Sequence, residues 1–134
     1  MTYAPTVALL EETALAVGAG SFWHGPKTNQ SINYNAPFPQ VHLFLMPAPT
    51  EGSMVRYQVV LCFYGKDEHE NGSDDSVQIQ DDMDQLSQRF VLALRDADDV
   101  EVAERVDRAP VLRQGSAIGT GFLCSFTLTA PALC

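Results

Sequence analysis

The feature that constrains the fold most is a long segment, residues 74–97, whose apolar side chains recur with helical spacing. They follow one another at intervals of four, three, four and four positions, at Ile79, Met83, Leu86, Phe90 and Leu94. This spacing predicts one apolar face on an α-helix. Aspartates crowd the first turns of the segment and arginines lie toward its end, an order that suits the helix macrodipole.

Two apolar segments before this helix predict an antiparallel hairpin. Residues 38–46 are apolar at both sets of alternate positions, which is typical of a central strand. Residues 55–64 alternate between apolar and polar side chains at their start. The prolines and the glycine of residues 47–54 predict the turn between the two strands.

The two ends of the chain supply the remaining predicted elements. Val7, Leu10, Ala14 and Val17 predict a short helix over residues 5–17. After the long helix, weak patterns at 100–106 and 109–114 precede a clear strand at 117–129. We therefore predict an α+β fold, in which a mostly antiparallel sheet of about four strands has two helices packed on one face, in the order α-β-β-α-β-β.

Length and composition predict a single domain spanning residues 1–134, because 134 residues that are 46% apolar can form one modest core. Residues 18–37 predict a long irregular loop, since Gly, Asn, Ser and Pro are abundant there. Its aromatic residues allow two interpretations. They form a satellite cluster of the core, or they contact a partner or another subunit. These residues are Phe22, Trp23 and Tyr34.

The charge is strongly acidic, with 8 Lys and Arg against 17 Asp and Glu and a net charge of −9. This balance argues against tight nucleic-acid binding, which needs clustered cations. No membrane contact is expected either: the apolar runs are too short to span a bilayer, no basic amphipathic stretch is present, and no secretory signal is visible.

Eight acids and no cation lie between positions 67 and 84. Such a run gives solubility, or it forms a surface that repels polyanions or meets a basic partner. The acids are Asp67, Glu68, Glu70, Asp74, Asp75, Asp81, Asp82 and Asp84.

The sequence has few residues in patterns that are typical of active sites. The cysteines have neither metal nor redox spacing, so Cys62 and Cys124, which lie in apolar runs, are interpreted as buried thiols in a reducing compartment. The three histidines lie far apart in the sequence, and His42 falls inside an apolar strand. We therefore predict that the protein is not an enzyme and has no catalytic residues.

One acidic segment begins like a calcium-binding loop. Residues 67–72 have the first-position Asp and the sixth-position glycine of an EF-hand loop, in which oxygen ligands are expected at alternate positions. The third position, however, is His69 and the twelfth is Gln78, where an oxygen ligand and a bidentate Glu are needed. A strand, rather than a helix, is predicted before it. We predict neither a metal nor a cofactor.

The order of the predicted elements and the residue pattern of the strands resemble those of a known family. The chain is similar to the tail terminator proteins of long-tailed bacteriophages. The similarity lies in an amphipathic first helix, a strand F-P-Q-V-H-L-F-L at 38–45, a strand V-R-Y-Q-V-V-L-C-F-Y at 55–64, a long helix and a closing hairpin. The related tail-completion and head–tail joining proteins are similar too. The resemblance covers residues 5–130. It lies in the order of the elements, in the pattern of apolar and polar residues along the strands, and in the length of the chain.

This resemblance implies a structural protein of the virion tail or neck, assembled in the host cytoplasm. It implies a ring, typically a hexamer, that caps the tail tube, binds the tube and head-connector proteins, and lets DNA pass without specific binding. The acids Asp67, Glu68, Glu70, Asp74, Asp75, Asp81 and Asp82 would line the lumen or form a partner surface. The alternative is a small cytosolic ligand-binding or regulatory α+β domain, with a groove between helices and sheet.

Overall fold

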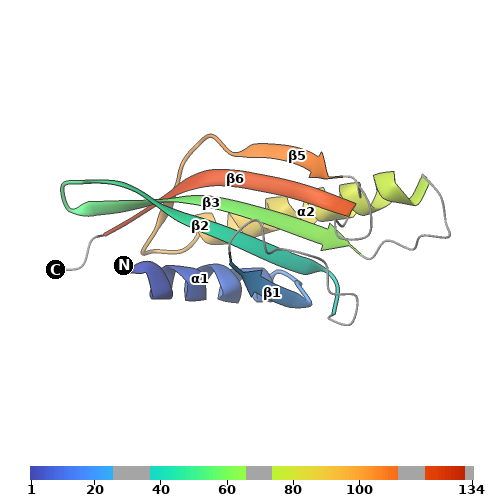
Figure 1. Ribbon diagram of the computed structural model, residues 1–134, viewed down its shortest axis with the longest axis horizontal. Coiled ribbons are helices and arrows are strands. Elements are labelled where there is room, and N and C mark those ends of the chain that lie inside the picture. The colour runs from blue at the N-terminus through green and yellow to red at the C-terminus, as the bar shows by residue number, and fades with distance from the viewer. Residues whose placement is uncertain (26–36, 66–73, 112–119, 132–134) are drawn as a thin grey trace.

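The computed structural model describes residues 1–25, 37–65, 74–111 and 120–131, and it describes no side chains for residues 49–51 and 74–76. Within these ranges the chain forms two helices and six strands (Figure 1). In chain order they are α1 (Tyr3–Ala16), β1 (Ser21–His24), β2 (Gln40–Glu51), β3 (Met54–Gly65), α2 (Asp74–Arg95), β4 (Glu101–Val102), β5 (Asp107–Val111) and β6 (Thr120–Pro131).

The strands form one mixed sheet in the order β1-β2-β3-β6-β4, and β5 also pairs with β6. β1 runs parallel to β2, while the other pairs are antiparallel. The predicted sheet of about four mostly antiparallel strands, in the order α-β-β-α-β-β, is therefore wrong. The described residues form an α+β fold with a mixed sheet of six strands, in the order α-β-β-β-α-β-β-β.

The extra strand lies inside the segment that was predicted as an irregular loop. Ser21 to His24 pair in register with Gln40 to Leu43 of β2. Four residues that follow two glycines carry too short a pattern to predict a strand. Their extended conformation depends on the neighbouring β2, because a strand of this length is not stable without a partner.

The hairpin of β2 and β3 is longer than its sequence pattern predicts. β2 continues to Glu51, through Pro47 and a second proline, and β3 begins at Met54. Gly52 in the tight turn has a φ of +60°, a conformation that glycine adopts without strain. Pro47 still has a cross-strand partner in Tyr57, so the prolines do not end the strand as predicted.

The core lies between one face of the sheet and both helices. Leu10 and Ala14 of α1 and Met83, Leu86, Phe90 and Leu94 of α2 are buried in one cluster with alternate residues of β2, β3 and β6. The rings of Phe63 and Phe90 meet edge to face, with centroids 5.7 Å apart. In Figure 1, α2 lies behind β3 and β6, and α1 runs alongside β2.

The backbones of β3 and β6 approach each other closely at one point. A Cβ atom at Gly121 would lie 1.8 Å from the carbonyl oxygen of Phe63, so no other residue fits there without a shift of the strands. A glycine inside a strand is typical of such a close approach of two backbones.

Candidate functional site

Helix α2 carries two exposed apolar side chains on its outer face. Five residues recur there at intervals of four, seven, four and three positions, which places them on one stripe opposite the core. We call them the outer stripe: Val77, Asp81, Gln88, Leu92 and Arg95. Val77 is 69% exposed and Leu92 is 63% exposed, so the stripe presents apolar surface near each of its ends.

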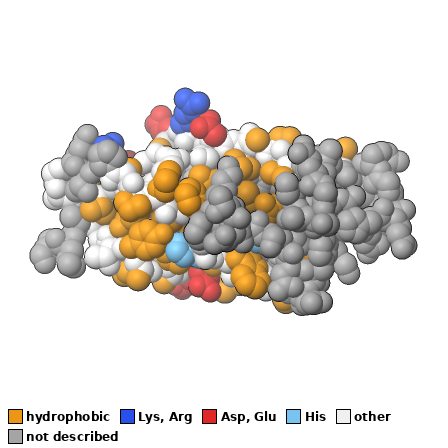
Figure 2. All heavy atoms as spheres, viewed as in Figure 1, with side chains coloured by type: hydrophobic (Ala, Val, Ile, Leu, Met, Phe, Trp, Pro, Cys, Tyr) orange, Lys and Arg blue, Asp and Glu red, His pale blue; other side chains and the backbone are white. Residues whose placement is uncertain are grey.

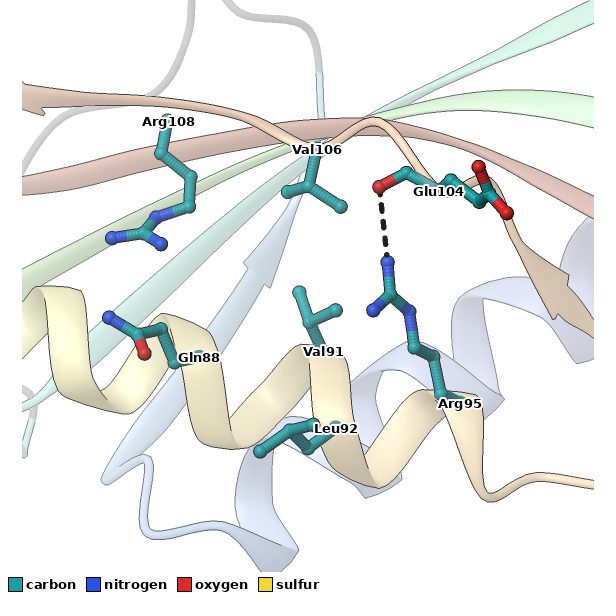
Figure 3. A pocket seen from close by; sticks show the side chains of 7 residues that line it. All are labelled: Gln88, Val91, Leu92, Arg95, Glu104, Val106 and Arg108. Carbon is teal, nitrogen blue, oxygen red and sulfur yellow. Dashed lines mark hydrogen bonds between the residues drawn. The ribbon is translucent and has the colours of Figure 1, made fainter.

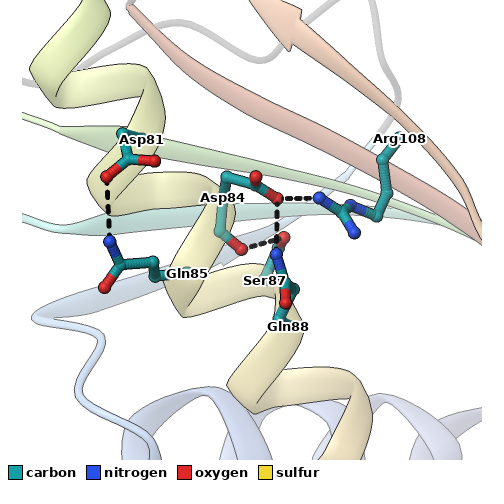
Figure 4. A network of polar contacts seen from close by, with 6 residues as sticks. All are labelled: Asp81, Asp84, Gln85, Ser87, Gln88 and Arg108. Carbon is teal, nitrogen blue, oxygen red and sulfur yellow. Dashed lines mark hydrogen bonds and ion pairs between the residues drawn. The ribbon is translucent and has the colours of Figure 1, made fainter.

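Polar contacts hold three carboxylates of α2, and Figure 4 shows those of Asp81 and Asp84. Three glutamine amides each donate to the aspartate one turn away along the helix: Gln85 to Asp81 at 2.9 Å, Gln78 to Asp82 at 2.9 Å and Gln88 to Asp84 at 3.3 Å. Asp84 also forms an ion pair with Arg108 of β5, which ties the helix to the edge of the sheet. Asp81 and Asp82 stay exposed to solvent.

A pocket of about 280 Å³ lies between the C-terminal half of α2 and the segment from Glu104 to Arg108. In Figure 3 the guanidinium groups of Arg95 and Arg108 lie at opposite ends of the pocket, and Val91 and Val106 face each other between them. Gln88, Leu92 and Glu104 complete the lining. The volume is near the lower limit for a small-molecule site, and it suits a single side chain well.

Both arginines of the pocket are anchored. One terminal nitrogen of Arg95, Nη2, donates to the backbone oxygens of Ala103 at 3.2 Å and Glu104 at 3.4 Å. Arg108 is paired with Asp84, and its Cζ lies 5.7 Å from the ring centroid of Phe122. A guanidinium has five N–H donors, so each arginine keeps donors that no other described residue uses.

The second candidate surface is the face of the sheet that neither helix covers, which we call the helix-free face. Strand register places Trp23, Phe44, Met46, Val60 and Leu123 on it. Trp23 is 41% exposed and Met46 is 46% exposed. Figure 2 views this side of the sheet: hydrophobic side chains predominate among the described residues, and charged ones lie toward the margins.

His42 lies on the helix-free side of β2 and is buried, with only 2% of its surface exposed. Its Nε2 is 3.3 Å from Oε1 of Gln40, and the Tyr64 ring stands perpendicular to it at 5.0 Å. Its Nδ1 has no hydrogen-bond partner among the described residues. Burial lowers the pKa of His42 to about 4, because a charged imidazole loses its hydration there. The ring is therefore neutral at physiological pH.

Two further groups are held in their protonated forms by burial. Burial, with a smaller contribution from Cys62, raises the pKa of the Tyr64 phenol well above its usual range. Burial also raises the pKa of the Cys124 thiol to about 12, against the opposing effect of Arg108. The thiolate is the reactive form of cysteine, so Cys124 is a poor nucleophile in this environment.

The structure separates the residues that were predicted to contact partners. Phe22 packs against the core on the helix side of the sheet, whereas Trp23 points to the helix-free face. Tyr34 lies outside the described residues. Of the predicted acidic surface, Asp81 and Asp82 are exposed on α2, and Asp74 and Asp75 begin that helix. Asp67, Glu68 and Glu70 lie outside the described residues.

Sequence reasoning missed the residues of the pocket. Leu92 had a detectable signal, because an apolar residue opposite the core stripe of a helix is out of phase with the hydrophobic period. Arg95, Glu104 and Arg108 had none, since the sequence does not show that the end of α2 faces the segment before β5. Their arrangement depends on how α2 packs on the sheet.

The chain matches no model of a known protein family, and no curated protein is significantly similar to it. Within the described ranges, no group of three or more His, Cys, Asp or Glu side chains is placed to hold a metal ion. Neither α1 nor the described α2 is both long enough and apolar enough to cross a membrane. The candidate functional sites are thus two surfaces, the outer stripe with its pocket and the helix-free face.

Proposed function

We propose that this protein is a structural subunit of a phage virion, a tail terminator that forms a ring on the tail tube and joins it to the head. The observation that carries the proposal is the helix-free face, which presents Trp23 and Met46 to solvent. A sheet face with exposed large apolar side chains favours contact with another protein surface. The particular assembly is the one implied by the resemblance of the strands at 38–45 and 55–64 and of the long helix to the tail terminator proteins.

The charge of the chain supports the same role. A channel for DNA must let the polyanion slide without binding, and acidic walls repel phosphates. A hexamer would carry six times the −9 of one chain. Whether Asp81 and Asp82 face the lumen or a partner, they contribute to an assembly that does not retain DNA.

The test is the mass of the purified protein, measured by light scattering after size exclusion over a concentration series, alone and with purified tail tube protein. We expect ring-sized particles alone, or rings that form once tube protein is added. The double variant Trp23→Ser, Met46→Ser should need about tenfold more protein for the same assembly, since it removes apolar contact area. Leu15→Ser is the matched control, because Leu15 is 47% exposed but lies on α1.

A protein that stays monomeric at every concentration, and that does not bind tube protein, would contradict this proposal. The second candidate function, a small ligand-binding or regulatory domain, would then gain weight. The pocket between α2 and the Glu104–Arg108 segment is the observation that favours it. Its size and its two guanidinium groups would suit a small carboxylate ligand.

A further inference from the structure

The pocket between α2 and the segment from Glu104 to Arg108 has two positive ends and an apolar middle. Arg95 lies at one end and Arg108 at the other, and Val91 and Val106 face each other between them (Figure 3). The chain has 17 acids against 8 Lys and Arg, so two arginines on one pocket are a marked local concentration of positive charge. Along the pocket, the order of chemical groups is cation, apolar wall, cation.

The Arg95 end is prepared to bind an anion. Its Nη2 donates to the backbone oxygens of Ala103 and Glu104, which are neutral acceptors and do not cancel the charge. Among the described residues, no carboxylate forms an ion pair with Arg95. Figure 3 shows the Glu104 side chain directed away from Val91 and Val106. A guanidinium whose position is already fixed loses little conformational freedom when it binds a carboxylate.

The Arg108 end has two donors held by one carboxylate. Arg108 forms an ion pair with Asp84, and the Gln88 amide donates to the same carboxylate oxygen at 3.3 Å. The guanidinium has five N–H donors and the amide has two, so both groups keep donors for a ligand. Asp84 offsets part of the positive charge here, and we therefore expect this end to bind an anion more weakly than the Arg95 end does.

The spacing of the two ends sets the length of a ligand that reaches both. Gln88 and Arg95 both line the pocket and are seven residues apart on α2, which is about 10 Å along a helix. A charge-assisted hydrogen bond of about 2.8 Å at each end leaves roughly 5 Å between two carboxylates, the span of a dicarboxylate of about four to six carbons. A ligand of this size suits a pocket of about 280 Å³.

We propose that this pocket binds a short aliphatic dicarboxylate. One carboxylate binds Arg95, the other binds Arg108 and Gln88, and the methylene groups lie between Val91 and Val106. The inference rests on the second candidate function, the ligand-binding domain, for which it names the class of ligand. It does not require the ring.

The pocket discriminates against other anions for physical reasons. A monocarboxylate of the same length pairs with one guanidinium only, and it places a methyl group against the polar donors of the other end. Inorganic phosphate carries its charge on one centre, so it reaches one end of the pocket and leaves the apolar walls uncovered. Only a ligand with an anion at each end and an apolar middle matches all three parts of the pocket.

The test is isothermal titration calorimetry of the full chain at about 20 mM salt, where screening is weak. The ligands are unbranched dicarboxylates of about four to eight carbons, the monocarboxylates of the same carbon number, and inorganic phosphate. We expect a dissociation constant of about 0.1–1 mM for the best dicarboxylate. It should bind about tenfold more tightly than its matched monocarboxylate and than phosphate, with an optimum at about four to six carbons.

Substitutions at each end identify the groups that bind. Arg95→Gln should weaken binding of the best dicarboxylate by about tenfold, because it removes the unpaired cation. Gln88→Leu tests the other end by about threefold and leaves the ion pair between Arg108 and Asp84 in place. Arg89→Gln is the matched control, since Arg89 is an exposed arginine on the same helix that does not line the pocket. Thermal unfolding without ligand shows that each variant is folded.

Three results would overturn the inference. They are a dicarboxylate that binds no better than its monocarboxylate, an affinity that does not depend on chain length, and an equal loss of affinity in Arg89→Gln and Arg95→Gln. The assembly measurement is separate. Rings without dicarboxylate binding overturn this inference alone, and a monomer that binds the dicarboxylate, inert toward tube protein, overturns the ring alone. A chain that does neither overturns both proposals.

Discussion

At the scale of single residues, His42 is the side chain whose placement has the clearest consequence. It is almost fully buried beside Gln40, Cys62 and Tyr64, none of which is an anion that could stabilise its charged form. An unfolded histidine binds its proton near pH 6.5, whereas His42 in the folded protein binds it near pH 4. Below pH 6.5, the unfolded state therefore holds more protons than the folded state.

We predict that the free energy of unfolding falls by about 1–2 kcal/mol between pH 7.5 and pH 5 because of His42 alone. The contribution is fully present above pH 6.5 and is lost as the pH falls toward 4. Urea denaturation at both pH values measures it. In His42→Phe, which keeps a ring of similar size, this part of the pH dependence should vanish. An equal loss in the variant would show that other groups cause it.

At the scale of elements, the packing of α2 on the sheet accounts for much of the core. Phe90 is fully buried against Phe63, and Leu92, two residues later, is largely exposed on the opposite side of the helix. We predict that Phe90→Ala lowers the free energy of unfolding by about 3–5 kcal/mol, since it leaves a cavity. Leu92→Ala should change it by no more than about 0.5 kcal/mol.

Chemical denaturation at low protein concentration compares these two variants with the wild type. The comparison is matched, because both residues are large, apolar and on the same helix. Equal effects would mean that the outer face of α2 is also packed within one molecule, and Leu92 would then not be available to a neighbour.

The elements that could be predicted are those in which apolar residues recur at regular intervals along the segment itself. The helix over residues 74–97, with its core face of Ile79 to Leu94, is α2 to within two residues at its end. The parts that could not be predicted depend on neighbours. β1 owes its extended form to β2, and β2 extends to Glu51 because β3 pairs with it beyond Pro47. The conformational preferences of single residues, including turn-forming residues, are weaker than the interactions that a strand makes with a paired neighbour.

The same distinction applies to the candidate sites. Trp23, Asp81 and Asp82 could be chosen from the sequence because an aromatic residue in a polar segment and a run of acids are visible there. Leu92, Arg95 and Arg108 are brought together by the packing of α2 against the edge of the sheet. No pattern in the sequence connects this leucine with these two arginines.

At the scale of the whole molecule, the net charge of −9 makes the protein repel the phosphates of DNA. We predict no binding to a labelled duplex of about 30 base pairs at micromolar protein, even at about 50 mM salt, where electrostatic binding is strongest. Fluorescence anisotropy measures this directly. Saturable binding that weakens as salt is added would contradict the prediction, and it would also count against a DNA channel lined by this protein.

The central position of β3 has a further consequence, which concerns amide hydrogen exchange. β3 is paired along its length with β2 on one side and β6 on the other, so its amides open to solvent only when the sheet separates. Exchange there should report the global stability, while β1 and β5, at the two edges, should exchange through smaller local openings. Assembly through the outer surfaces would then slow exchange where copies touch and leave the rates in β3 governed by the fold itself.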